Sequence, residues 1–435
     1  MSSKFRQPPL QAREAKMLSN FYLHRMLLPF CLPINRNRQS SLRLFCILSQ
    51  LLYMKPLQTI TILLYLLLPG FYKKANAQVQ QTEARIDSLM HHYKMVGLSV
   101  AVVKKGRIIY THAFGKKNIA TGTPLTDSNM FRIASISKSF SATAIMQLVQ
   151  AKKLSLDEDV SKLIGFRVRN PKFPGKVITL KMLMSHTSSL NDSRGYFTYD
   201  SINPSKSANW AECYNDYAPG AGYQYCNYNY NIIGGIIERA SGERFDHYIK
   251  THILDPLHLY AGYEVAALDS SRFATLYEYD SATKKYTAAD DAYLQNTNII
   301  DHYKMGISTP VFSPTGGMKI SAPDLAKYMT MHMNYGEYKG TRIISRKSAK
   351  TMQRKVSDGD GGYGLAIETK DDLIAGKTMK GHTGSAYGLY SIMFWQPKEK
   401  FGIVAITNGM NLVVDDGYNE VTKAVVNILY EGFIK

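Results

Sequence analysis

The chain has 435 residues, of which 45% are apolar and 20% are charged, and this composition is typical of a globular protein and argues against disorder. Its formal net charge of +19 is concentrated near the N-terminus, where residues 1–77 carry eleven Lys or Arg and a single acid, Glu14. The rest of the chain has no dense basic run, which argues against a nucleic-acid partner. No Cys or His cluster has zinc spacing, and no HExxH motif occurs.

A secretory signal peptide is predicted at residues 54–77, with the sequence MKPLQTITILLYLLLPGFYKKANA. Lys55 supplies the positive start, Leu57–Leu68 is an apolar core too short for a comfortable membrane span, and Ala75–Ala77 is an A-x-A cleavage site. We expect cleavage after Ala77 and export to the periplasm or the extracellular space, with an uncleaved membrane anchor as the alternative. Residues 1–53 precede a complete signal, so we interpret them as an extension that a start codon placed too early would explain.

Hydrophobic periodicity in residues 78–435 predicts an α+β protein. The apolar run Leu98–Val103, a turn at Lys104–Gly106 and the run Arg107–Tyr110 indicate a β-hairpin, and Leu389–Trp395 with Phe401–Thr407 indicates another. Helical spacing is found at residues 135–150, 179–184, 232–240 and 421–434, and in a helix that begins at Ser321 with Asp324 as its capping partner. Residues 190–230 have the composition of a surface loop. We expect the sheet to be built from the N- and C-terminal segments.

Two of the four cysteines, Cys213 and Cys226, lie in the predicted exported domain, where oxidation is allowed. Two cysteines do not form a disulfide framework. The sequence leaves open whether they pair across a short loop or stay free.

The sharpest motif is the S-x-x-K tetrapeptide from Ser135 to Lys138, which opens an apolar helix. A spacing of three residues places both side chains on one helical face. A serine hydroxyl is a weak nucleophile that needs a neighbouring base. A lysine amine can serve as that base if desolvation or nearby positive charge lowers its pKa. By itself the tetrapeptide also fits an ordinary N-capped helix.

Two further motifs change the balance between these interpretations. Tyr225–Asn227 lies 90 residues after Ser135 and combines a phenol that can act as a general base with an amide that can orient a lysine. Gly381–Ser385 precedes a predicted strand, where glycines let a substrate backbone approach and a backbone N–H can donate to an oxyanion. Each alone is compatible with a packing tyrosine or a turn, but their order and spacing together favour a catalytic site.

The three motifs resemble those of the serine β-lactamase and penicillin-recognising hydrolase superfamily. The resemblance is strongest to the branch of class C β-lactamases, D-alanyl-D-alanine carboxypeptidases, D-aminopeptidases and esterases, which carries S-x-x-K, Y-x-N and K/H-[ST]-G. It covers about residues 85–430. It includes residues 131–134, 178–190 and 219–242 and the pair Gly316–Gly317.

The resemblance implies an α+β fold in which an antiparallel sheet flanked by helices forms an α/β lobe. This lobe would comprise about residues 78–155 and 315–435, and an all-α lobe would comprise about residues 156–314, with the site between them. Neither a metal nor an organic cofactor is expected.

The resemblance also assigns roles to individual residues. Ser135 corresponds to the acylated nucleophile, and Lys138 and Tyr225 correspond to the proton-transfer pair. The backbone N–H groups of Ser135 and Ser385 would form the oxyanion hole. The other substrate-binding positions are Asn227, His382, Thr383 and Gly384.

Three positions invite separate interpretations. The superfamily usually has Lys at the position of His382, and a histidine is shorter and mostly neutral at pH 7, so we expect carboxylate-bearing substrates to be disfavoured there. His186 has no coherent acid partner in the sequence, so a structural hydrogen-bonding role is favoured over a triad. Ser189 replaces a glycine that is usual in the family, which predicts a different local turn.

These observations predict an exported serine hydrolase that forms an acyl-enzyme on Ser135 and cleaves amide or ester bonds of small substrates. D-amino acid peptides, cell-wall fragments and esters are the candidates. A true β-lactamase and a catalytically silent cell-wall binding protein are the alternatives. The expected partner is a small-molecule or peptide substrate, without nucleic acid, and with membrane contact only through the signal segment; no oligomeric state is indicated.

Overall fold

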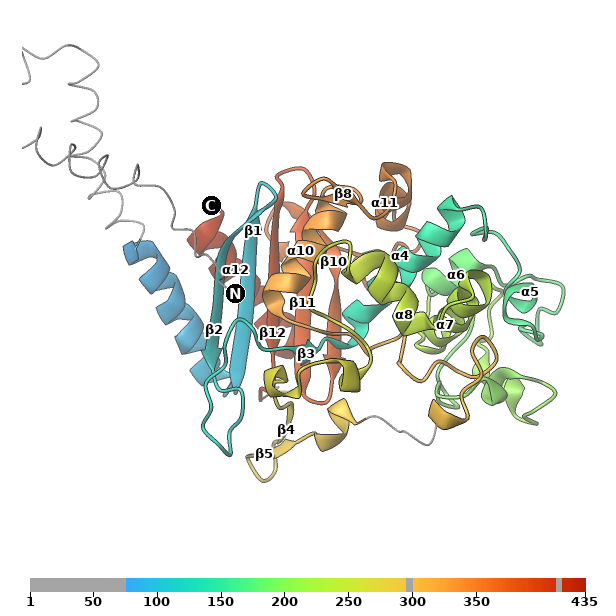
Figure 1. Cartoon of the computed structure of the whole chain (residues 1–435), viewed down its shortest axis with the longest axis horizontal. Helices are drawn as coiled ribbons and strands as arrows, with labels where there is room; N and C mark the ends of the chain where they lie inside the picture. Colours follow the sequence, from blue (N-terminus) through green and yellow to red (C-terminus); the bar gives the residue numbers. More distant parts are fainter. Residues whose placement is uncertain (1–75, 295–299, 412–416) are drawn as a thin grey trace, which may run out of the picture. The chain divides into compact units, whose positions relative to one another are not determined.

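The computed structural model describes residues 76–294, 300–411 and 417–435 (Figure 1). Their central feature is a six-stranded antiparallel sheet with the strand order β2-β1-β12-β11-β10-β9. The strands are β1 (Gly97–Lys104), β2 (Arg107–Gly115), β9 (Glu368–Ile374), β10 (Lys377–Ala386), β11 (Leu389–Gln396) and β12 (Phe401–Thr407). The sheet therefore joins the N- and C-terminal segments, as predicted.

Both predicted hairpins are confirmed, and local chemistry explains the first. Lys105 and Gly106 form the turn between β1 and β2 with φ values of 52° and 75°. Two consecutive positive φ values are typical of the tight hairpin turn that matches the twist of antiparallel strands. β1 then pairs on its other edge with β12, which places Val100 opposite Ala405.

Helices cover both faces of the sheet, so its strands are buried on both sides. Val100 and Val102 of β1 face a core shared with the helix at residues 76–92 and with α12 (Gly417–Phe433). Ala101 and Val103 face a second core, shared with α10 (Ala322–Met333). Burial on both faces explains why β1 is apolar throughout rather than alternating.

The second part of the fold is a helical group around α7 (Tyr228–Ser241), which packs against four other helices (Figure 1). These are α4 (Ser137–Gln150), α5 (Val160–Ile164), α6 (Leu180–Met184) and α8 (Phe245–Ile249), and α11 (Arg346–Gln353) contacts α4 from another side. The short strand pairs are β3 (Phe131–Arg132) with β6 (Lys319–Ile320), β4 (Tyr277–Asp280) with β5 (Lys285–Ala288), and β7 (Glu337–Tyr338) with β8 (Thr341–Arg342). The predicted α+β class is confirmed. The lobe boundaries stay a prediction, and the β4–β5 hairpin falls inside the stretch expected to be helical.

Several helix boundaries differ from the sequence prediction. α4 begins at Ser137, after a 3-10 turn at Ala134–Ile136, and α7 and α12 each begin four residues earlier than expected. At α10, the Ser321 hydroxyl accepts a hydrogen bond from the Asp324 N–H as predicted. The Asp324 carboxylate, however, accepts from the Tyr260 N–H at 3.1 Å, so it ties a neighbouring loop to the helix.

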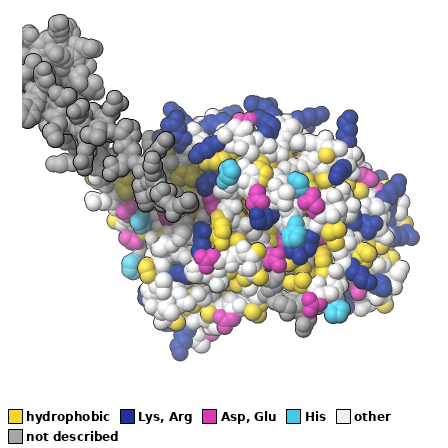
Figure 2. All heavy atoms as spheres, viewed as in Figure 1, with side chains coloured by type: hydrophobic (Ala, Val, Ile, Leu, Met, Phe, Trp, Pro, Cys, Tyr) yellow, Lys and Arg dark blue, Asp and Glu magenta, His cyan; other side chains and the backbone are white. Residues whose placement is uncertain are grey.

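The cysteines and the N-terminal region complete the comparison with the sequence. Cys213 and Cys226 are both free and buried, so they do not form a disulfide. The signal sequence up to residue 75 lies outside the described residues. Within the described part of the chain, no helix has the length and apolarity needed to cross a membrane. On the face shown in Figure 2, Lys and Arg side chains alternate with acidic ones, which fits a mixed solvated surface.

Candidate active site

The predicted nucleophile lies at a strained turn between β3 and α4. Ala134 has a φ of 49°, a left-handed conformation that is costly for a residue with a Cβ. The turn leaves Ser135 partly exposed, while the next two residues, Ile136 and Ser137, are buried. Only the first serine of the tetrapeptide therefore reaches solvent, and the Ser137 hydroxyl instead accepts from the Met318 N–H at 3.1 Å.

Lys138 lies directly behind this serine and is completely buried. Its Nζ is 3.0 Å from the Ser135 Oγ, 2.9 Å from the Asn227 Oδ1 and 3.2 Å from the Thr315 carbonyl oxygen. Burial lowers the pKa of Lys138 to about 7, although the Asp192 carboxylate opposes that shift. The amine is therefore substantially neutral near pH 7.

The partners of Nζ determine where the lone pair of a neutral amine points. The Asn227 Oδ1 and the Thr315 carbonyl can only accept hydrogen bonds, so together they take both N–H groups of the neutral amine. The lone pair is then left for the Ser135 hydroxyl, 3.0 Å away. The arrangement is that of a general base in contact with its nucleophile.

Tyr225 lies against the same amine. The Lys138 Nζ is 4.8 Å from the centroid of the Tyr225 ring and 5.7 Å from that of Tyr230. Contact with two aromatic faces partly compensates a lysine that carries its proton. The structure brings the S-x-x-K and Y-x-N motifs together, and the role of Tyr225 in proton transfer stays a prediction.

Asp192 is a site residue that the sequence analysis missed. Its carboxylate accepts hydrogen bonds from the Asn227 N–H at 2.8 Å, the Asn227 Nδ2 at 3.0 Å and the Tyr228 N–H at 3.0 Å. It therefore caps the start of α7, where Asn227 makes no capping bond of its own. It also fixes the amide of Asn227 so that Nδ2 faces the carboxylate and Oδ1 faces Lys138.

His186 has the structural role that the sequence predicted. It is buried, and its Nδ1 accepts from the Cys226 N–H at 3.1 Å, which places the proton of a neutral ring on Nε2. Burial lowers its pKa well below the usual range. The ring thus holds the backbone of the Y-x-N motif.

Ser189 has a φ of 66°, so it keeps the left-handed conformation that a glycine would adopt, although the sequence predicted a different local turn.

The third motif lies on β10, next to the nucleophile turn. A Cβ at Gly384 would approach the Ile133 carbonyl oxygen to 2.3 Å and the Ser135 N to 3.2 Å. The glycine is therefore required for the strand to lie this close to Ser135. Ser385, the next residue, is exposed, and Thr383 donates through Oγ1 to the Glu368 Oε1 at 3.2 Å.

His382 is the predicted binding residue that the structure places least favourably. It is only 1% exposed, and its Nδ1 lies 2.6 Å from the Thr383 carbonyl oxygen, so that nitrogen carries a proton. Its Nε2 is 2.9 Å from the Tyr363 hydroxyl, and the Glu368 carboxylate is 3.4 Å from Nδ1. The ring is thus held in the wall by protein groups, and a buried acid that the sequence analysis missed stands beside it.

A cavity of about 620 Å³ joins these parts, a size usual for small-molecule sites. The predicted residues that line it are Ser135, Tyr225, Asn227, His382, Thr383, Gly384 and Ser385. Lys138 lies behind its wall. Arg132, Glu278, Glu368 and Lys370 also line it, so the wall of the cavity carries charges of both signs.

One group elsewhere in the described residues has the spacing of a metal site. Asp246, His247 and Glu264 bring their ligand atoms within 4.8 Å of one another. The Arg244 guanidinium already binds both carboxylates, at 2.6 Å from Asp246 and 2.9 Å from Glu264. A protein cation therefore occupies the centre of this group.

Comparison with known proteins agrees with the geometry. A family model described as Beta-lactamase matches residues 82–427. Protein flp of Staphylococcus aureus (strain MRSA252) is 23% identical over 359 residues, which cover 77% of this chain and 63% of that protein. Penicillin-binding protein 4 of Amycolatopsis lactamdurans is 26% identical over 345 residues, which cover 75% of this chain and 84% of that protein. The chain thus spans less than two thirds of the length of Protein flp.

Solved structures show the same fold. The octameric penicillin-binding protein homologue from Pyrococcus abyssi has a TM-score of 0.65 and 26% identity, over 81% of this chain and 77% of that one. The D-amino acid amidase from Ochrobactrum anthropi SV3 has a TM-score of 0.63 and 20% identity, over 82% of this chain and 99% of that one. At that identity, the second likeness concerns the fold alone. Since the family model matches most of the chain and the described fold agrees with it, this protein belongs to the Beta-lactamase family.

Proposed function

We propose that this protein is an exported serine hydrolase that forms an acyl-enzyme on Ser135 and cleaves amide or ester bonds of small substrates. The observation that carries the proposal is the position of the Lys138 Nζ, 3.0 Å from the Ser135 Oγ and held by two acceptor-only oxygens. A buried amine with a pKa of about 7 in this contact is suited to take the serine proton near neutral pH.

Acylation follows from the contacts around Ser135. Its Oγ attacks the carbonyl carbon of the substrate while its proton passes to the Lys138 amine. The backbone N–H groups of Ser135 and Ser385 donate to the oxyanion that forms. The carbon–nitrogen or carbon–oxygen bond to the leaving group then breaks, and the leaving group takes the proton from Lys138 through Tyr225.

Deacylation reverses these transfers with water as the nucleophile. Lys138 and Tyr225 accept a proton from the water as it attacks the acyl carbonyl. The bond between the acyl carbon and the Ser135 Oγ breaks, and the proton returns to that oxygen. The products are the free acid and the regenerated enzyme, with no metal or organic cofactor in any step.

Active-site labelling tests the proposal directly. A fluorescent phosphonate should label the wild type on Ser135 and should leave Ser135→Ala unlabelled. Ser137→Ala is the matched control, because Ser137 is buried in the same turn and should keep the label. Labelling of Ser135→Ala, or loss of the label in Ser137→Ala with the fold intact, would show that the nucleophile is wrongly assigned.

Two alternative functions predict different results in activity assays. A true β-lactamase would hydrolyse a cephalosporin at least as efficiently as simple esters. A silent binding protein would take up penicillin or phosphonate without turning over any ester or D-amino acid amide. The contact between Ser135, Lys138 and Asn227 favours turnover over silence.

The pattern of the signal at residues 54–77 supports export. N-terminal sequencing of protein from the periplasm or the membrane fraction should begin at Gln78. Recovery of the intact 435-residue chain from the cytoplasm would contradict it.

A further inference from the structure

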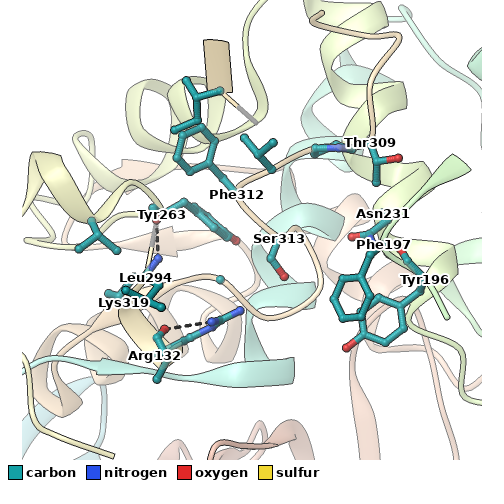
Figure 3. A pocket seen from close by; sticks show the side chains of 16 residues that line it. Arg132, Tyr196, Phe197, Asn231, Tyr263, Leu294, Thr309, Phe312, Ser313 and Lys319 are labelled. Carbon is teal, nitrogen blue, oxygen red and sulfur yellow. Dashed lines mark hydrogen bonds between the residues drawn. The ribbon is translucent and has the colours of Figure 1, made fainter. Parts of the chain in front are cut away.

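A second cavity, which we call the side cavity, adjoins the catalytic cavity and has a volume of about 250 Å³ (Figure 3). It shares Arg132, Tyr196, Phe197 and Ser313 with the catalytic cavity. Pockets that hold whole small ligands usually measure roughly 300–1,000 Å³. The side cavity is therefore suited to one substituent of a substrate whose reacting bond lies at Ser135.

Two cations stand together in the side cavity. Arg132 of β3 and Lys319 of β6 are direct cross-strand partners. Like charges in that position repel each other. The Arg132 guanidinium donates to the backbone carbonyls of Gly316 at 3.1 Å and Ala292 at 2.9 Å, which fix it without neutralising it.

Lys319 is equally short of a counter-charge. It is 6% exposed, and its Nζ donates to the Tyr263 carbonyl oxygen. Burial, followed by the Arg132 charge, lowers its pKa to about 7 against the opposing influence of Asp246. The Asp246 carboxylate is itself bound by Arg244 at 2.6 Å. Among the described residues that line the side cavity, none is acidic.

The opposite wall of the side cavity is aromatic. Figure 3 shows Tyr196 and Phe197 across from Arg132 and Lys319 in this view. The two rings lie 4.3 Å apart, and Phe197 is 78% exposed, which is unusual for a phenylalanine. An exposed aromatic ring at the rim of two cavities offers apolar contact to a passing substrate chain.

We infer that the side cavity binds a carboxylate at the end of an apolar acyl chain, with Arg132 and Lys319 as its cations and Phe197 along the chain. The inference rests on the proposed function and names a substrate class for it, namely esters and amides of dicarboxylic acids. A carboxylate would supply the missing negative charge beside Arg132, and by favouring the protonated form of Lys319 it would give that buried amine its charge as well. The apolar methylene groups would pack against the aromatic rim.

Monoesters of p-nitrophenol with dicarboxylic acids test the inference, with succinate to suberate covering the chain length. Each monoester is compared with its methyl-capped form, which has the same chain and no charge. At the best length, the wild type should prefer the free acid by tenfold or more in kcat/KM. In Lys319→Met, the ratio of kcat/KM for the free acid to kcat/KM for the methyl-capped ester should fall to about one. Lys370→Met is the matched control, since Lys370 lies in the catalytic cavity but not in the side cavity, and it should keep the ratio.

Each outcome has a definite meaning. If the methyl-capped esters are hydrolysed through Ser135 but no length shows a preference, or if Lys370→Met abolishes the ratio instead, the side cavity is not the anion site. Phe197→Ser provides a second variant that should fold, because this side chain is exposed, and it should weaken both esters in proportion to chain length. If neither ester is hydrolysed, the proposed function fails.

A binding measurement separates the two failures. In Ser135→Ala, calorimetry with the adipate monoanilide should show at least tenfold tighter binding than with its methyl ester. Lys319→Met in the same background should remove the difference. Equal binding of the acid and the methyl ester would overturn the inference whether or not turnover is observed.

Discussion

Lys138 and Lys319 are both buried, and burial lowers the pKa of each to about 7. Their surroundings differ. Lys138 contacts the Ser135 Oγ and two acceptor-only oxygens, whereas Lys319 donates to one backbone carbonyl and otherwise faces a cavity. Desolvation alone therefore produces an amine of intermediate pKa, and the contacts decide its task. The hydroxyl within reach of Lys138 suits that amine to act as a base, whereas Lys319 lies beside a cavity whose described lining residues include no acid, as the inferred anion site requires.

The largest expected effect separates the two lysines by turnover. Lys138→Met should lower kcat/KM for a neutral p-nitrophenyl ester by roughly 10³-fold or more, because Ser135 loses the amine that contacts its hydroxyl at 3.0 Å. Lys319→Met should cost at most a few-fold on the same ester, since that cation is expected to act on charged substrates. Steady-state kinetics with both variants at pH 8 checks the contrast. Similar losses in the two variants would break the distinction between base and anion site.

The next largest effect concerns Asp192, whose carboxylate binds the Asn227 amide and raises the pKa of Lys138. Asp192→Asn should lower kcat by about 10- to 100-fold, because one of the two carboxylate oxygens that bind Asn227 and Tyr228 becomes an NH2 group that cannot accept, and the charge that fixes the Asn227 amide is lost. In the wild type, kcat/KM should rise with pH through about 7, as Lys138 must be neutral to accept the serine proton.

The direction of the pH shift distinguishes positioning from general damage. Asp192 raises the pKa of Lys138, so its replacement by Asn should move the acid limb of kcat/KM to lower pH. A merely destabilised enzyme would lose activity without that shift. Asp192→Ser, which removes the charge and still offers one acceptor, should show the same direction. An unchanged limb in both variants would mean that Asp192 acts on the fold alone.

Thermal stability is a property in which the two lysines should behave alike. Their folded-state pKa values lie below those of an unfolded lysine, so the unfolded chain binds more protons between about pH 7 and 10. Each buried amine therefore destabilises the fold most below about pH 7, and this penalty fades as the pH rises. Lys138→Met and Lys319→Met should each raise the melting temperature at pH 6 by several degrees, and by less at pH 9. A loss of stability at pH 6 in either variant would contradict the expectation that burial of the charged amine destabilises the fold.

The sequence predicted the parts of the site that lie within a few residues of one another. Ser135 and Lys138 are three residues apart, and the glycine of the third motif is required at Gly384. The sequence placed that motif before a strand, whereas the structure places it within β10. Asp192 escaped prediction because it meets Asn227 across 35 positions of irregular loop, where no periodicity connects them. Arg132 and Lys319 were likewise invisible as a pair, since only the β3–β6 pairing brings them together.

The same argument explains which parts of the fold were predictable. The two hairpins follow from apolar runs around turn residues, and both form as expected. The helix starts were less accurate, because the 3-10 turn before α4 and the Asp192 cap of α7 depend on distant contacts. Ser189 keeps a glycine-like φ although its identity argued otherwise, and a hydrogen bond from the Asn170 Nδ2 at 3.1 Å holds its hydroxyl.

The smallest expected effect is that of His382→Lys. His382 occupies the position where the superfamily usually has Lys, so the sequence predicts that His382→Lys favours carboxylate-bearing substrates, including β-lactams, over neutral esters. The structure predicts a smaller effect, because the Glu368 carboxylate lies 3.4 Å from the His382 Nδ1. Both side chains are almost fully buried in the wall of the catalytic cavity. A lysine placed there would pair with Glu368 before it met a substrate. The single change should therefore raise cephalosporin hydrolysis relative to a neutral ester by only a few-fold.

His382→Lys combined with Glu368→Gln should raise it further, because the competing charge is gone while the Thr383 hydroxyl keeps an acceptor. The measurement is kcat/KM for a cephalosporin and a p-nitrophenyl ester in the wild type, the single variants and the double variant. Efficient cephalosporin hydrolysis by the wild type, unchanged in the double variant, would mean that the cephalosporin carboxylate is recognised elsewhere in the cavity, and Lys370 would then be the next cation to replace.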